Sequence, residues 1–171
     1  MKKIVNEFLI NNFTKTDDKF NSLGVGKPKL IKEWLEKYII IDYEILEDLS
    51  ITVNGDVYLT SFKINNFPSY IQFATIIGDF RLTNNDFTSL KGCPKKVMGD
   101  FSCSFNNLSS LEYGPEIVSR EYFCKNNPIN TLEYLPLKCK YLDMGRNILL
   151  SKDYLDKMTK NVEYPLYTSY E

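Results

Sequence analysis

The chain from Ile77 to Leu149 repeats one pattern four times, and this repetition limits what the protein can fold into. Each copy has two residues, two positions apart, that are candidates for facing the core. An asparagine follows three positions later, and an apolar residue follows two positions after the asparagine. In the first copy these residues are Phe80, Leu82, Asn85 and Phe87. The asparagines of the four copies are separated by 21, 21 and 20 residues: Asn85, Asn106, Asn127 and Asn147. A fixed period of this length predicts a solenoid in which each copy forms one rung.

The spacing within one copy indicates how each rung folds. On an extended strand Phe80 and Leu82 point to one face and Arg81 points to the other. The chain must then turn, and a buried Asn amide can pair with the backbone groups carried into the interior. The sequence therefore predicts an α/β leucine-rich-repeat solenoid with a short parallel sheet and an asparagine ladder. A weaker copy at Val57–Leu59, with Phe62 in the asparagine column, brings the expectation to about five rungs.

The repeats are expected to occupy residues 54–150 of a single domain, with capping segments on both sides. Residues 1–53 predict a helix over 4–13, a second helix starting at Pro28 with Trp34 in its apolar stripe, and a hairpin ending at Val53. The first helix packs on the end of the solenoid or serves as a detachable arm. Residues 151–171 predict a helix from Ser151 to about Lys160 and a tyrosine-rich tail, which packs on its own chain or is free for a partner.

Several phrases of the repeat carry a family resemblance. They are Gly78-Asp79-Phe80, Thr88 to Val97 and Gly99 to Ser104, together with the lead-in around Trp34 and residues 48–57. These resemble a family of short leucine-rich-repeat proteins of bacteriophages and bacterial mobile elements. The resemblance covers residues 30 to 150 and implies the architecture and an origin in a phage or mobile element, but not an activity. Lys140-Tyr141 departs from the Gly-Asp of the pattern.

Charge and composition exclude several functional classes. The formal net charge of −1 provides no basic field for nucleic acid. No apolar run is long enough for a membrane span, and no signal peptide is recognisable, so a cytoplasmic location is expected. The sequence has no histidine, and its four cysteines form no C-x-x-C motif, so we expect no enzyme activity, no metal and no cofactor. Cys103 and Cys124 fall in one inward column, as two reduced core thiols or as a cross-rung disulfide.

A column of carboxylates precedes the strands: Asp56, Asp79, Asp100 and Glu121. Stacked like charges repel, so such a column could hold a cation or a basic partner. Alternatively, each carboxylate accepts local backbone hydrogen bonds in a solvated turn. The sequence leaves both interpretations open.

The outward strand positions are the main candidates for function, because solenoids bind partners over such extended faces. Phe105 and Phe123 stand where a structural repeat would carry a small polar residue, and aromatic and arginine side chains are typical interface anchors. The candidate partner-binding residues are Tyr58, Arg81, Phe105, Phe123, Lys125 and Arg146. We expect a non-catalytic protein-interaction module that binds a host or phage protein. A structural virion component is the alternative, and an effector-type ligase fragment is the third.

Overall fold

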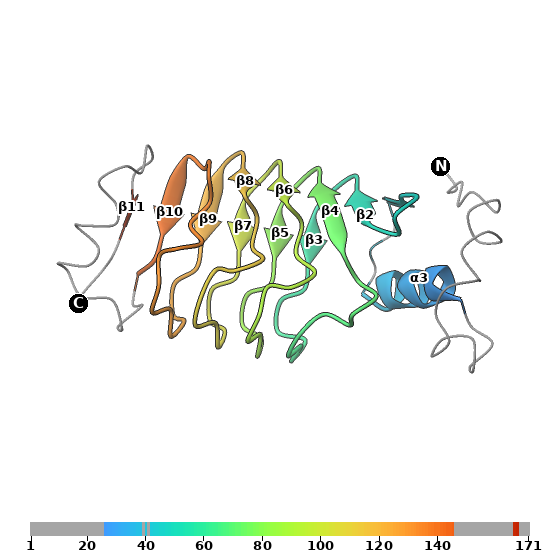
Figure 1. The fold of residues 1–171 in the computed structure, drawn as a ribbon, viewed down its shortest axis with the longest axis horizontal. Helices are drawn as coiled ribbons and strands as arrows, with labels where there is room; N and C mark the ends of the chain where they lie inside the picture. The colour runs from blue at the N-terminus through green and yellow to red at the C-terminus, as the bar shows by residue number, and fades with distance from the viewer. Residues whose placement is uncertain (1–25, 39, 41, 146–165, 168–171) are drawn as a thin grey trace.

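The structure is a computed structural model that describes residues 26–38, 40, 42–145 and 166–167. These residues form a parallel β-solenoid whose turns stack side by side along the long axis, with a single helix at the N-terminal end of the stack (Figure 1). The predicted solenoid is therefore confirmed at the level of its parallel turns. Within the described part of the chain, no helix is long and apolar enough to cross a membrane.

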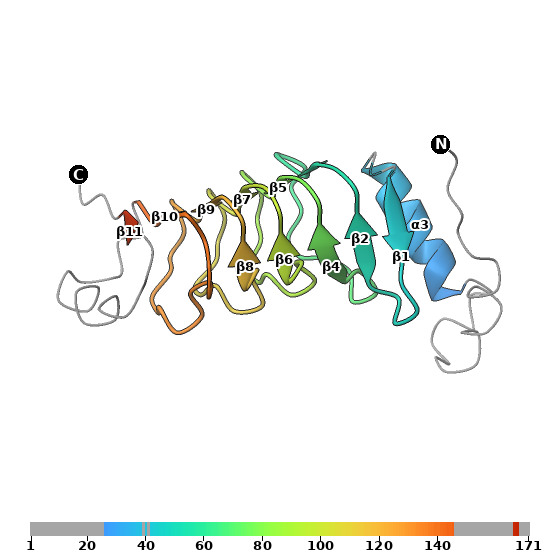
Figure 2. The same ribbon diagram turned by 90° about the horizontal axis from the view of Figure 1, so that it is seen from above.

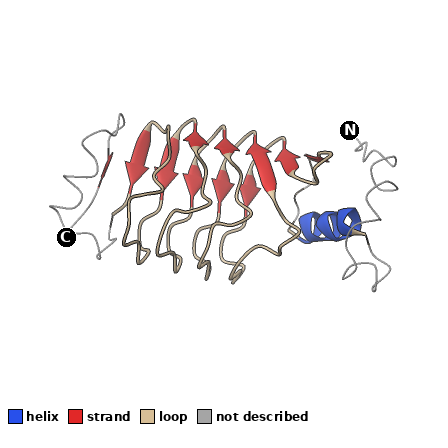
Figure 3. Ribbon diagram, viewed as in Figure 1, coloured by secondary structure: helices blue, strands red, loops and turns tan. Residues whose placement is uncertain are grey.

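Two sheets run along the solenoid (Figure 3). Sheet A begins with an antiparallel hairpin and continues as parallel strands: β1 (Tyr43–Ile45), β2 (Ile51–Val53), β4 (Phe73–Ile76), β6 (Lys96–Val97) and β8 (Ile117–Val118). Sheet B is parallel throughout: β3 (Val57–Tyr58), β5 (Phe80–Arg81), β7 (Phe101–Ser102), β9 (Glu121–Phe123), β10 (Tyr141–Asp143) and β11 (Leu166–Tyr167). Four turns, β2–β3 to β8–β9, contribute a strand to each sheet.

Sheet A corrects the prediction of a single sheet. The sequence predicted one short parallel sheet, but most turns return through a strand of a second sheet, as Figure 2 shows from above. In β6 and β8 these strands have only two residues, the first exposed and the second buried. An alternation of two residues is too short to be recognised as a period-two pattern. The hairpin was predicted to belong to the N-terminal cap, but β2 pairs with β4 and begins the parallel part of sheet A.

The predicted asparagine ladder is present, and the structure describes three of its four asparagines, Asn85, Asn106 and Asn127. The Asn106 side chain accepts a hydrogen bond from the Phe87 N–H at 3.0 Å and donates to the carbonyls of Leu82 and Cys103, both at 3.0 Å. Asn85 and Asn127 make the equivalent contacts one turn before and one turn after. Each amide therefore joins two neighbouring turns through backbone groups that water cannot reach.

A stack of aromatic rings fills the core between the sheets. Phe80 and Phe101 are adjacent in register, with ring centroids 6.0 Å apart and planes 20° from parallel. Phe101 continues the stack to Tyr122 at 4.7 Å, and Phe73 of sheet A meets Phe80 at 5.2 Å. The core is therefore continuous from turn to turn, which is how a solenoid stabilises repeats that could not fold alone.

Helix α3 (Lys27–Lys37) covers the N-terminal end of this core. Pro28 lies in its first turn, as predicted. Backbone N–H groups in the first turn have no partner within the helix, so the missing N–H of proline costs no hydrogen bond there. Ile31, Trp34 and Leu35 are buried on one stripe, and the Trp34 ring lies 5.7 Å from Phe67 and 6.2 Å from Phe73. The prediction that the only tryptophan belongs to the core is confirmed.

The fourth repeat is shortened at a corner. Ile117 pairs with Lys138, 21 residues later, whereas Glu121 pairs with Tyr141, 20 residues later. The missing residue therefore falls between the two sheets. Cys139 is buried, although Ile77 and Met98, which share its place in the sequence repeat, are exposed at the corners of earlier turns.

Several predictions concern residues outside the described ranges: the helix over residues 4–13, Asn147, and the helix from Ser151 to Lys160. In the tail, Leu166 and Tyr167 pair in parallel with β10, which agrees with packing of this segment against its own chain.

Candidate functional site on the outer face of sheet B

The outer face of sheet B, which we call the sheet B face, carries most of the predicted binding residues. One register column runs across five strands and contains Tyr58, Arg81, Ser102, Phe123 and Asp143. A second column lies two residues later and includes Thr83, Ser104 and Lys125. The predicted alternation places these side chains away from the ring stack, but their exposure differs greatly along the face.

Tyr58 and Arg81 form one end of the face. The Arg81 guanidinium carbon lies 5.5 Å from the centre of the Tyr58 ring, and its Nη2 donates to Asp79 Oδ2 at 2.9 Å. The hydrogen bond to Asp79 raises the pKa of Arg81, so its charge is secure. The Tyr58 hydroxyl donates to Asp56 at 2.8 Å, which raises the pKa of Tyr58. Both side chains remain accessible to a partner, with 51% of Tyr58 and 44% of the Arg81 side chain exposed.

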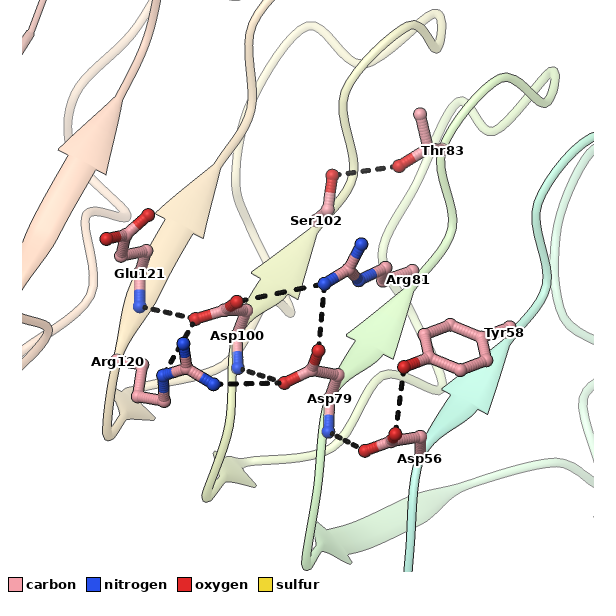
Figure 4. A network of polar contacts seen from close by, with 9 residues as sticks. All are labelled: Asp56, Tyr58, Asp79, Arg81, Thr83, Asp100, Ser102, Arg120 and Glu121. Atoms are coloured by element: carbon pink, nitrogen blue, oxygen red, sulfur yellow. Dashed lines mark hydrogen bonds and ion pairs between the residues drawn. The ribbon is translucent and has the colours of Figure 1, made fainter.

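The carboxylate column forms a ladder of its own along the edge of this face (Figure 4). Asp56, Asp79 and Asp100 each accept the backbone N–H of the next carboxylate residue, at 2.8, 2.9 and 3.2 Å. The pKa of Asp56 is lowered, mainly by the hydrogen bond from the Asp79 N–H and then by the hydrogen bond from the Tyr58 hydroxyl. These N–H groups belong to the next turn, and Arg81 and Arg120 pair with Asp79 and Asp100. The carboxylates are therefore held between turns, which corrects the interpretation of local hydrogen bonds within a solvated turn.

Arg120 contributes to the ladder from a position that the sequence analysis missed. It occupies the column of Gly78 and Gly99, and its guanidinium lies 3.4 Å from Asp100 and 4.0 Å from Asp79. A Cβ at Gly99 would meet the Gly78 carbonyl carbon at 2.6 Å, so the glycines permit close stacking of the earlier corners. An arginine in a glycine column beside an acidic column was the sequence signal for this contact.

The sheet B face is more enclosed than predicted at β7, just after β7 and at β10. The strand alternation places Ser102, Ser104 and Asp143 on this face, yet they are only 8%, 2% and 8% exposed. Ser102 exchanges a hydrogen bond with Thr83 at 2.8 Å, whereas the Ser104 hydroxyl has no hydrogen-bond partner among the described residues. Larger side chains of neighbouring turns shield the small side chains between them from solvent. The sequence shows side-chain direction but not this shielding.

Phe105 lies in the turn after β7 and not on the strand, which corrects its predicted place. Its φ is 56°, and the residues at the same place in neighbouring turns, Ser61, Asn84 and Asn126, also have positive φ. This left-handed conformation suits asparagine but is a steric outlier for a bulky side chain. The Phe105 side chain is nevertheless 48% exposed. Its N–H donates to the Lys125 carbonyl at 3.0 Å, so Phe105 and Lys125 are neighbours.

Phe123 and Lys125 form the other end of the described face. Phe123 is half-buried in β9, so it is less accessible than an outward aromatic residue was expected to be. Lys125 reaches Asp143 with an Nζ–Oδ2 distance of 3.7 Å, and 43% of its side chain is exposed. Arg146 lies outside the described residues. The structure thus brings Phe105 next to Lys125, with Phe123 two residues before Lys125 and with Tyr58 and Arg81 farther along the same face.

The cysteines contribute no reactive group to this face. All four are buried and form no disulfide, and burial raises the pKa of Cys93, Cys103 and Cys124 well above the ordinary value. Their thiolates, the reactive form, are therefore suppressed at neutral pH. No group of three or more acidic or cysteine side chains among the described residues could hold a metal ion.

Two exposed tyrosines on the returning arcs were not selected from the sequence. Tyr113 and Tyr134 follow Leu111 and Leu132 by two residues, in the column where the preceding turn has Gly92. They are 50% and 45% exposed and line a cavity next to sheet A. A large aromatic residue in a glycine column was the signal that could have identified them.

Comparisons of this chain with protein-family models, with curated proteins and with solved structures found no match.

Proposed function

We propose that this protein is a non-catalytic interaction module that binds a protein partner through the sheet B face. The binding surface is centred on Phe105, with Lys125 beside it and with Phe123, Tyr58 and Arg81 farther along the face. Aromatic and arginine side chains that are fixed by their neighbours and still exposed are the usual energetic centres of protein interfaces. Arg81 and Lys125 would pair with acidic groups of the partner.

The backbone of Phe105 carries this proposal. Asparagine occupies the same left-handed position in two neighbouring turns, whereas a bulky residue there costs about 1–2 kcal/mol. The exposed ring recovers little of this cost in the isolated protein. Burying a Phe side chain at an interface would contribute about 1.5–3 kcal/mol. Strained, exposed residues of this kind cluster at sites of function, and the unpaired Ser104 hydroxyl directly precedes Phe105 in the chain.

The leucine-rich-repeat identity and the origin in a phage or mobile element belong to the same proposal. Both rest on the repeat phrases, and the repeat architecture alone is further supported by the asparagine ladder, in which each amide joins neighbouring turns. On this view the protein is an accessory factor in the cytosol of the cell. Its recovery from the cytosol and not from purified particles would agree with this role, whereas recovery from particles would favour the structural alternative.

The test is the substitution Phe105→Asn. Asparagine fits the left-handed backbone, so the melting temperature should stay the same or rise. Partner recovery in an affinity pull-down, quantified by mass spectrometry, should fall more than tenfold because the central ring is lost. A structural role for Phe105 would instead lower the melting temperature.

Ile77→Ser is the matched control, because Ile77 is an exposed apolar residue at a corner outside the sheet B face. It should leave partner recovery unchanged. Undiminished recovery by the double variant Phe105→Asn, Phe123→Ser would contradict the proposed site.

A further inference from the structure

A second candidate surface lies where two returning arcs enter sheet A, just before β8 and at the following turn. A cavity of about 230 Å³ opens there. Its walls combine three exposed aromatic or aliphatic side chains with three charged ones: Tyr113, Tyr134, Leu137, Lys95, Glu116 and Glu133. None of these residues belongs to the sheet B face.

The backbone of Tyr113 shows the same kind of conflict as that of Phe105. Its φ is 67°, and the residue in the same column of the preceding turn is Gly92, with a φ of 99°. Glycine adopts this conformation without steric cost, whereas a tyrosine does not. Tyr113 remains 50% exposed in spite of this. A bulky ring is thus held at a strained position where it gains little burial.

The apolar part of the cleft continues onto the next turn. Tyr134 is 45% exposed and Leu137 is 77% exposed, the largest value among the exposed hydrophobic residues that the structure describes. Both line the same cavity as Tyr113. Two aromatic walls and an apolar side chain, contributed by adjacent turns, make a cleft suited to a flat group with an apolar stem.

The charged residues around the cleft favour a ligand group that is positively charged. Lys95 Nζ lies 2.7 Å from Glu116 Oε1, so the single lysine of the cleft is already paired with one of its two carboxylates. Glu133 is left to face a partner, and the Glu112 carboxylate beside the cleft accepts a hydrogen bond from Tyr113, which raises the pKa of that tyrosine. The cleft therefore has a negative balance at neutral pH.

We propose that this cleft, the tyrosine–carboxylate cleft, binds an arginine side chain of a protein partner. A guanidinium group is planar, stacks on aromatic rings and pairs with carboxylates, so it matches the rings of Tyr113 and Tyr134 and the charge of Glu133 together. The volume agrees with a side chain rather than a whole small molecule, because pockets for drug-sized ligands range from about 300 to 1,000 Å³. The site is independent of Phe105 and gives the solenoid a second docking point.

The experiment titrates the full chain with acetyl-Gly-Arg-Gly-amide at low salt and follows the tyrosine ring signals by NMR. The same peptide with citrulline in place of arginine is the matched probe, because it keeps the shape and removes the charge. Saturable shifts of the Tyr113 and Tyr134 signals are expected with the arginine peptide, with at least tenfold weaker binding of the citrulline peptide. Equal shifts with both peptides, or no shift with either, would overturn the proposal.

Two variants separate binding from folding. Tyr113→Gly introduces the residue that the preceding turn uses at this position, so it should fold with an unchanged or higher melting temperature and bind the peptide at least tenfold more weakly. Glu133→Gln should weaken binding of the arginine peptide and leave that of the citrulline peptide unchanged. Full binding by both variants would place the arginine elsewhere. Since Phe105→Asn should leave the shifts intact, this result is distinguishable from a failure of the sheet B face.

Discussion

At the scale of single residues, the buried asparagines stabilise the solenoid because each one satisfies several backbone groups at once. Asn106 accepts one N–H and donates to carbonyls of its own turn and of the preceding turn. The residue is 6% exposed. An apolar residue of similar size would fill the space but would leave these backbone groups buried without partners.

Asn106→Leu should therefore lower the free energy of unfolding by about 1–3 kcal/mol, the usual cost of leaving a buried polar group unpaired. Asn107→Leu is the matched control, because Asn107 is exposed and its backbone N–H donates to the Phe87 carbonyl with any side chain. Urea unfolding followed by circular dichroism measures both variants. Equal midpoints would show that the ladder does not stabilise the stack.

At the scale of elements, most strands of the two sheets have only two or three residues, so no strand is stable apart from its neighbours. Helix α3 closes the first turn by placing Trp34 against Phe67 and Phe73. The ring is 8% exposed. The polar side of the helix carries exposed ion pairs, such as Lys32–Glu36 at 3.9 Å, which contribute little.

Trp34→Ala should destabilise the protein by about 3–5 kcal/mol, because it removes a large buried side chain and leaves a cavity at the end of the core. Lys32→Ala changes the opposite side of the same helix and should alter stability by less than about 0.5 kcal/mol. Thermal unfolding of the two variants provides the comparison. A Trp34→Ala protein as stable as wild type would mean that α3 is not the cap of the solenoid.

At the scale of the whole molecule, stability passes from turn to turn through the ring stack and the asparagine ladder. The cysteines report on this continuity, because they are spread over the stack and all are buried. Cys93, Cys103 and Cys124 belong to inner turns, whereas Cys139 follows the last complete turn. Burial raises the pKa of Cys139 to about 12 and those of the other three well above the ordinary value.

In the native protein at pH 8 the thiols should therefore be protonated and react slowly with a disulfide reagent such as DTNB. Increasing urea should expose Cys139 first and then the three inner cysteines together, because end turns open at lower cost than inner ones. Mass spectrometry of the labelled protein assigns each step. Independent exposure of Cys103 and Cys124, which lie in neighbouring turns, would refute a cooperative core.

The sequence by itself determined what repeats along the chain. The inward column from Phe80 to Leu142, the asparagine ladder and the apolar stripe of α3 depend on local spacing, since side-chain direction on a strand or helix follows from its period. Tertiary structure decided what depends on neighbouring turns. Sheet A was not predicted because its shortest strands span only two residues. Ser102 and Ser104 are buried by side chains from neighbouring turns, which the sequence pattern of one turn does not show. The left-handed backbone of Phe105 follows from stacking, because Ser61, Asn84 and Asn126 adopt the same conformation at the same place in other turns.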